Sequence, residues 1–256
     1  MVGAMIAGVL LGLGASACWA LANVAVQRAG HAVGPYRALL WSQAAGLVFV
    51  AAFALPMEHP SLALAPATLG WVAVAGVAAL VAYVCLFYAF AHGRLTLAVP
   101  IMASWAVIAA GLSLSLFGER LSSGQLAGGA AVGFGVLIPA IRALGPAFGD
   151  VGSIGVVYLA DALLGLPLAL LFRVDLALPT GRAWLPVLLA GLFETAGFAC
   201  IAVGARLAPL ALVSPLASLA SALTLLAAWI FLGERPGRGV LVGAVLVSAG
   251  VVVLAL

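Results

Sequence analysis

Two acidic residues lie deep inside long apolar segments of this sequence. Glu194 and Asp161 each stand near the middle of such a segment. A charge at the centre of a bilayer costs on the order of 3 kcal/mol or more, so each acid needs a partner or a water-filled cavity. Both are candidates for a transport path, where they would bind a cationic group or carry a proton. The alternative is a protonated acid that is hydrogen-bonded to a neighbouring helix.

A polar face is expected on the first apolar segment. Trp19, Asn23 and Gln27 are spaced four residues apart, which places them on one side of a helix. Buried amides need hydrogen-bond partners, so this face should point into the protein. Substrate contact and helix–helix packing are both open as its role.

An aromatic stripe is expected on the third apolar segment. Tyr83, Phe87 and Phe90 share one helical face, which would suit an apolar or cationic substrate. Ordinary packing is the alternative.

Two prolines in matching positions are the remaining candidates for cavity lining. Pro100 and Pro215 lie near the start of two apolar segments, and each is followed by hydroxyl side chains, among them Ser104 and Ser218. Proline removes a backbone donor and frees a carbonyl. Such breaks often line transporter cavities, although proline is also tolerated at a helix start without a functional reason.

Enzyme, cofactor, metal and nucleic-acid sites are not indicated. The sequence has no G-x-S-x-G, no H-E-x-x-H and no phosphate-binding Gly loop that ends in Lys. Its ten basic residues are all Arg and do not cluster, so the net charge of +3 predicts no nucleic-acid surface. The three Cys lie in apolar runs without metal-type spacing.

The composition requires lipid as the solvent of the protein. Apolar residues make up 66% of the 256 residues and charged residues 7%, against roughly 25% charged residues in soluble domains. A spanning helix needs about 20 mostly apolar residues. We therefore predict an all-α, polytopic transmembrane bundle in a single membrane domain. Nine spans are expected, at 3–27, 35–56, 68–92, 95–117, 124–141, 150–172, 183–205, 209–232 and 238–256.

Part of the sequence is an internal repeat. A constant shift of 115 residues brings Gly76 onto Gly191 and Pro100 onto Pro215. The same shift brings one charged triplet onto another, Gly118, Glu119 and Arg120 onto Gly233, Glu234 and Arg235. Apolar segments match easily by chance, but a charged triplet with matching Pro and Gly does not. We infer a duplication of three helices, which is typical of secondary transporters whose sites lie between the repeats.

The paired segments resemble the EamA family of the drug/metabolite transporter superfamily. The resemblance is carried by a helix that opens near Pro, an apolar run that ends in Leu-Gly-Glu-Arg, and a Gly-rich helix, each present twice. It implies ten helices in two inverted five-helix halves and the export of small metabolites across an inner membrane. The two Gly-Glu-Arg segments are expected to be structural, as helix caps or interfacial salt bridges, with gating as the alternative.

The span count departs from the family pattern. We divide the chain into a first half, 1–141, with five spans, and a second half, 142–256, with four or five. Four spans between the two Gly-Glu-Arg segments would place both on one side of the membrane. Two alternatives follow: the halves are parallel, or one predicted span contains two crossings.

The function expected from these features is secondary transport. We predict a multi-pass transporter or exporter of a small, amino-acid-like or other organic solute in the inner (plasma) membrane. It would work by alternating access and could be proton-coupled. A magnesium-type cation transporter and a scaffold or sensor without a transport cycle are the alternatives. We expect no enzyme activity, no cofactor and no nucleic-acid partner, and either a monomer or a homodimer formed through Gly-rich helices.

Overall fold

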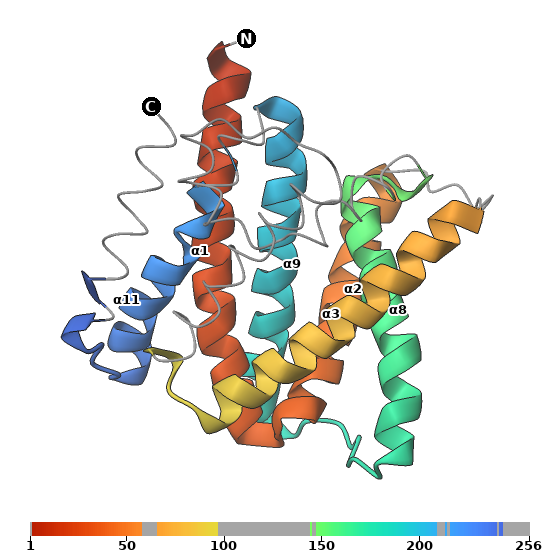
Figure 1. Ribbon diagram of the computed structural model, residues 1–256, viewed down its shortest axis with the longest axis vertical. Coiled ribbons are helices and arrows are strands. Elements are labelled where there is room, and N and C mark those ends of the chain that lie inside the picture. Colours follow the sequence, from red (N-terminus) through yellow and green to blue (C-terminus); the bar gives the residue numbers. More distant parts are fainter. Residues whose placement is uncertain are drawn as a thin grey trace.

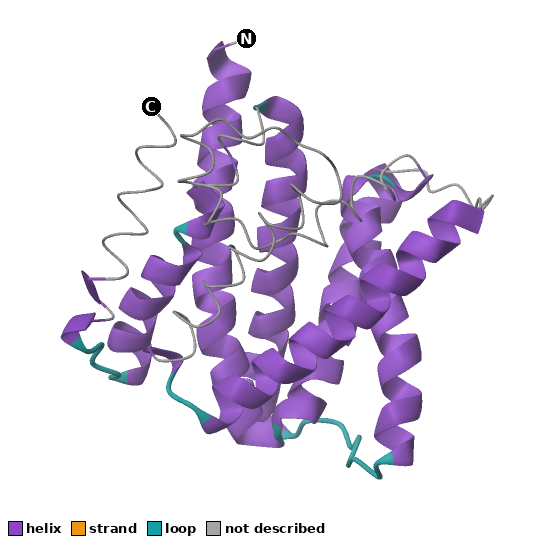
Figure 2. Ribbon diagram, in the orientation of Figure 1, coloured by secondary structure: helices purple, strands orange, loops and turns teal. Residues whose placement is uncertain are grey.

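The structure is a bundle of long helices. This computed structural model describes residues 2–57, 66–96, 144, 147–208, 213, 216–239 and 241–242. Every regular element in this part of the chain is helical (Figures 1 and 2). The elements are α1 (Val2–Val33), α2 (Pro35–Met57), α3 (Pro66–His92), α8 (Asp150–Leu171), the short 3-10 helix η1 (Gly181–Ala183), α9 (Trp184–Leu207) and α11 (Ala220–Leu232).

The predicted helical membrane bundle is confirmed in the described residues. Four helical segments there are long and apolar enough to cross a membrane: Gly3–Val33, Pro66–His92, Val151–Leu171 and Gly181–Leu207. Helix α2 lies where the span 35–56 was predicted. The predicted span 95–117 lies outside the described residues, except for Leu95 and Thr96. Span 124–141 and most of span 238–256 also lie outside them.

Helix α1 is longer than its predicted span. The prediction ended it at residue 27, before the charged Arg28, but the helix continues to Val33. Arg28 is exposed, and its guanidinium donates to the carbonyl oxygen of Phe231 at 2.7 Å. Gly34 then turns the chain with a positive φ of 85°, a conformation that favours glycine.

Helix α11 lies within a predicted span. It covers Ala220–Leu232 of the span expected over 209–232, and residues 213 and 216–218 before the turn at Leu219 are also helical. The other residues of that span lie outside the described residues. Gly233 ends α11 in the left-handed conformation, with φ 69°. This is the usual use of glycine after a helix, and it explains why the Gly-Glu-Arg triplet begins with glycine.

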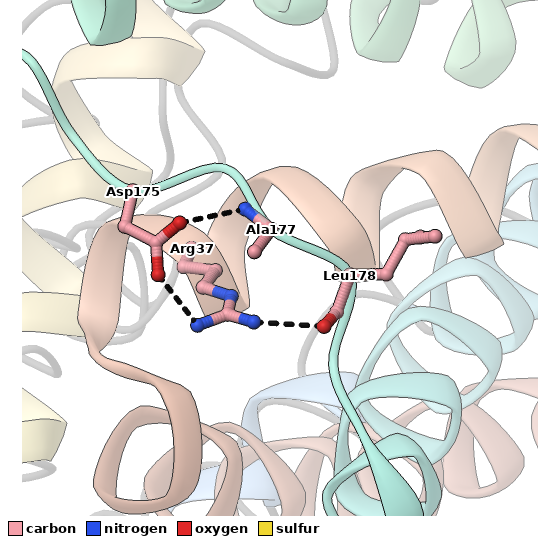
Figure 3. Close-up of polar contacts among 4 residues, drawn as sticks. All are labelled: Arg37, Asp175, Ala177 and Leu178. Atoms are coloured by element: carbon pink, nitrogen blue, oxygen red, sulfur yellow. Dashed lines mark hydrogen bonds and ion pairs between the residues drawn. The ribbon is translucent and has the colours of Figure 1, made fainter.

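Three connections fix which helix ends lie at the same end of the bundle. Arg37, at the start of α2, forms an ion pair with Asp175 at 3.0 Å and donates to the carbonyl oxygen of Leu178 at 2.8 Å (Figure 3). The segment before α9 is therefore held beside the α1–α2 turn. Gln27, near the end of α1, donates to the carbonyl oxygen of Gly93, just after α3, at 3.2 Å. The end of α3 and the start of α9 thus share one end of the bundle.

The two copies of the repeated helix run in opposite directions. The 115-residue shift pairs α3 with α9, and α3 ends where α9 begins (Figure 1). This relation is inverted, and it rules out the parallel alternative for this pair. Two predicted spans, an even number, separate α3 from α8, whereas the end of α3 and the start of α8 lie at opposite ends of the bundle (Figure 1).

Small residues bring the central helices close together. Helix α1 packs most extensively against α9, and Gly197 of α9 leaves room for the indole of Trp19. Helix α2 also approaches α9 closely, because a Cβ on Gly191 would collide with the carbonyl oxygen of Ser42. Close approach of this kind is what small residues allow in membrane helices. It brings polar side chains of α2, α8 and α9 within reach of one another.

Candidate functional site

A small cavity lies where the helices of the first half meet those of the second. We call it the midspan cavity. Its volume is about 10 Å³, which is room for about one water molecule. Helices α1, α2 and α3 contribute part of its wall, and α8 and α9 contribute the rest. Its lining residues are Val26, Ser42, Gln43, Tyr83, Phe87, Tyr158, Ala190, Gly191 and Glu194.

Glu194 and Tyr83 are the central polar pair of this cavity. The hydroxyl of Tyr83 donates to Oε1 of Glu194 at 3.1 Å. Glu194 is half-buried and Tyr83 is buried. The contact joins α3 to α9, and so joins the two repeat copies of one helix. Phe87, one turn further along α3, adds an aromatic wall, so a carboxyl group and aromatic rings surround one small space.

Asp161 is buried next to this cavity but does not line it. It is 3% exposed, and its Oδ2 accepts a hydrogen bond from Nε2 of Gln43 at 3.1 Å. Gln43 does line the cavity and therefore stands between it and Asp161. The structure thus brings the two predicted midspan acids close to one cavity, Glu194 in its wall and Asp161 one residue behind.

The polar face of α1 points into the protein but away from the midspan cavity. The Trp19 ring packs edge-on against Phe198, with ring centroids 5.2 Å apart. Asn23 donates to the hydroxyl of Thr224 on α11 at 3.0 Å. These contacts connect helices rather than line the cavity, and only Val26 of α1 is part of the cavity wall.

A second polar site lies at one end of the bundle, which we call the end cluster: Glu234, Gln27, Gly93, Leu95 and Thr96. Oε1 of Glu234 accepts from Nε2 of Gln27 at 3.1 Å and from the backbone N–H of Leu95 at 3.2 Å. Oε2 accepts from the backbone N–H and from the hydroxyl of Thr96, both at 3.0 Å. A carboxylate on two successive N–H groups at a helix start is a capping arrangement.

The ionisation of Glu234 follows from these contacts. Burial alone would raise the pKa of Glu234, but the hydrogen bonds from Thr96, Gln27 and Leu95 outweigh it and hold the pKa below its ordinary value of 4.5. The carboxylate is therefore charged at neutral pH. Arg235, the next residue, is exposed.

Some predicted candidates do not join the midspan cavity or cannot be placed. Ser218 is half-buried ahead of α11 and does not line the cavity. Pro100, Ser104, Pro215, Gly118, Glu119 and Arg120 lie outside the described residues. The described part of the chain contains no group of three or more His, Cys, Asp or Glu side chains that would hold a metal ion.

The sequence analysis missed several polar residues of the site. Ser42 and Gln43 are adjacent polar residues inside the predicted span 35–56, and a buried amide in a span should have marked them as candidates. Tyr158 lies one helical turn before Asp161, which is also a detectable spacing. Its hydroxyl accepts a hydrogen bond from Thr195 at 3.4 Å.

Comparison with solved structures supports the architecture. One crystal structure aligns with this chain at a TM-score of 0.68 and 20% sequence identity, and the alignment covers 96% of each chain. At this identity the likeness shows the fold alone. No curated protein matches the sequence.

Comparison with protein families identifies both repeats. The model of the EamA-like transporter family matches twice, over residues 6–141 and 129–256. The first match contains α1, α2 and α3, and the second contains α8, α9 and α11, so the midspan cavity lies between the two. The predicted internal repeat and the predicted family are confirmed. Because the two matches together span nearly the whole sequence, this multi-pass membrane chain belongs to the EamA-like transporter family.

Proposed function

We propose that this protein is a secondary transporter that moves a small organic solute by alternating access and couples transport to protons through Glu194. The observation that carries the proposal is the Glu194–Tyr83 pair in a cavity between the two inverted repeats. Transporter sites are typically found at this place, near the middle of the bilayer and between the repeats.

The chemistry of the cavity suits exchange between a proton and a solute. Glu194 accepts a single hydrogen bond among the described residues, from Tyr83. Its remaining acceptor capacity is available for a proton or for a donor group on a solute. The rings of Tyr83, Tyr158 and Phe87 supply apolar and aromatic contacts, and these favour an organic solute, including one that carries an amine.

The proposed transport cycle requires the cavity to open. A volume of about 10 Å³ does not admit an organic solute. The helices around the cavity must separate before a solute can enter, and the inverted halves offer two opposite directions for that movement. A scaffold or sensor without a transport cycle would have no need for a midspan cavity that contains a carboxyl group.

Transport measurements in proteoliposomes test the proposal. Amino acids, amines and other small solutes would be screened under an imposed proton gradient and under solute exchange. We expect Glu194→Gln to abolish gradient-driven uptake and to spare exchange, because the amide keeps the shape of the carboxyl but does not release a proton. Failure of the wild-type protein to move any candidate under either condition would count against the proposal.

Two finer parts of the proposal need separate tests. We place the protein in the inner (plasma) membrane, which fractionation of cells would check. The divalent-cation alternative predicts uptake of magnesium into proteoliposomes without any organic solute. That uptake, together with its loss in Glu194→Gln, would replace the organic solute as the substrate class.

A further inference from the structure

Gln43 and Asp161 form a buried pair that lacks one hydrogen-bond donor. Nε2 of Gln43 donates to Oδ2 of Asp161 at 3.1 Å. The other oxygen of each group, Oε1 of Gln43 and Oδ1 of Asp161, is buried and has no hydrogen-bond partner in the described part of the chain. The two side chains are only 7% and 3% exposed, so bulk water does not supply a donor.

A proton on Asp161 would supply the missing hydrogen-bond donor. A buried acceptor without a donor is unfavourable, and here two such acceptors belong to residues that already share one hydrogen bond. Rotating the Gln43 amide does not help, because it would set its oxygen against Oδ2 of Asp161. A single proton on Oδ1 of Asp161 converts that atom into a donor and provides the donor that Oε1 of Gln43 lacks.

We propose that Gln43 and Asp161 form a buried proton-binding site, in which Asp161 carries a proton on Oδ1 and donates it to Oε1 of Gln43. The acid and the amide then face each other through two hydrogen bonds, one in each direction. The site is neutral, and it holds its proton while Glu194 exchanges its own.

The surroundings of Asp161 favour the neutral acid. No ion pair to Asp161 is found within the described residues. The titratable groups that interact with it are Tyr83 of α3 and Tyr158 of α8, whereas α2 presents the uncharged Gln43. None of these groups is a cation, and a negative charge on Asp161 would be opposed by the loss of hydration.

The site assigns different roles to the two midspan acids. Glu194 lines the cavity, where it can reach a solute or a proton path. Asp161 lies behind Gln43, so it is a positioning residue: it joins α8 to α2 and fixes the orientation of the amide that lines the cavity. Asparagine at position 161 would offer one donor and one acceptor to Gln43, and so would reproduce both hydrogen bonds.

Infrared spectroscopy of the purified protein tests the site without any transport assay. In a Glu194→Gln background, we expect a carbonyl band of a protonated carboxyl group at neutral pH, sensitive to exchange into D2O. The band should disappear in the Glu194→Gln/Asp161→Asn double variant. A spectrum that lacks the band at neutral pH, or keeps it in the double variant, would overturn the proposal.

A transport arm, which rests on the proposed function, separates positioning from coupling. Asp161→Asn should keep solute exchange within about twofold of wild type, because both hydrogen bonds are preserved. Asp161→Leu should lower exchange about tenfold or more, because Gln43 loses both partners. Loss of exchange in a folded Asp161→Asn protein would contradict the inference. A wild-type protein that moves nothing would refute the transporter instead and leave the infrared result standing.

Discussion

The midspan cavity and the end cluster each contain a glutamate from the second half of the chain, but the two carboxyl groups have very different surroundings. Glu234 accepts four hydrogen bonds from three residues. Glu194, among the described residues, accepts one, from Tyr83. A carboxylate with all its acceptor positions filled is fixed in charge and orientation. A carboxylate with one donor in a small cavity is free to take up a proton or a ligand.

This difference separates a structural contact, the end cluster, from the proposed transport site, the midspan cavity. The end cluster ties the last turn region of α11 to the end of α3 and to α1, across the two halves of the chain. In the midspan cavity, Glu194 has one hydrogen bond among the described residues, and the small residue Gly191 lies in the wall. The end cluster therefore connects the two halves of the chain, whereas the midspan cavity is the proposed site of proton and solute binding.

The largest expected effect comes from enlarging Gly191 in the cavity wall. A Cβ at this position would collide with the carbonyl oxygen of Ser42, so Gly191→Ala must push α9 away from α2. We expect a loss of about 3 kcal/mol in the free energy of unfolding, measured in detergent, together with loss of transport.

The matched control for this substitution is Gly70→Ala on α3. No atom lies within 4 Å of a Cβ built there, so stability should stay equal or rise by up to about 1 kcal/mol through helix propensity. Equal stability of the two variants would show that the close contact of α2 and α9 is not needed.

Removing the carboxylate of the end cluster should have the next largest effect. Glu234→Ala removes the acceptor of two backbone N–H groups, of the Thr96 hydroxyl and of one of the two hydrogen bonds that the Gln27 amide donates. We expect a loss of about 2 kcal/mol, because a helix cap and side-chain hydrogen bonds are lost together. Thermal unfolding would measure it, with the exposed Arg235→Ala as the control, expected within about 0.5 kcal/mol of wild type. Abolished transport in a fully stable Glu234→Ala protein would break the comparison between the two sites.

Removing one hydroxyl from the midspan cavity should affect transport more than stability. Tyr83→Phe deletes the donor to Glu194 and leaves the ring in place. We expect uptake to fall about tenfold, which corresponds to about 1.4 kcal/mol. The control is Tyr88→Phe on the same helix, since Tyr88 is 58% exposed. Initial rates in proteoliposomes measure the difference, and equal rates for the two variants would contradict a role for this hydrogen bond.

The smallest effect is the pH dependence contributed by Glu234. Its folded-state pKa lies below the ordinary value of 4.5, so its hydrogen bonds stabilise the fold fully above pH 4.5 and lose this effect as the pH falls through the lowered value. We expect the stability advantage of wild type over Glu234→Gln to shrink by less than about 1 kcal/mol on acidification, because the group is partly exposed. An advantage that grows toward acid would mean that the neutral acid is the favoured form.

The sequence by itself determined the helices and the family. Apolar segments fix helix existence because backbone groups in lipid must be paired within the segment, and the predicted spans 35–56 and 183–205 agree closely with α2 and α9. Helix ends were predicted less closely: α1 continues past the predicted end at residue 27 to Val33, because a charged residue ends an apolar run without ending the helix. The repeat was visible because a charged triplet and matching Gly and Pro recur at one spacing.

The tertiary structure determined the relative direction of the repeated helices and the hydrogen-bond partners of the two midspan acids. The inverted relation of α3 and α9 depends on which helix ends meet, and the predicted span count left it open. The sequence placed Glu194 and Asp161 at midspan but not their partners, because Tyr83 and Gln43 lie 111 and 118 residues away along the chain. The packing of α2, α8 and α9 determines which acid faces the cavity and which faces an amide. Local sequence patterns do not predict packing between segments that are distant in the chain.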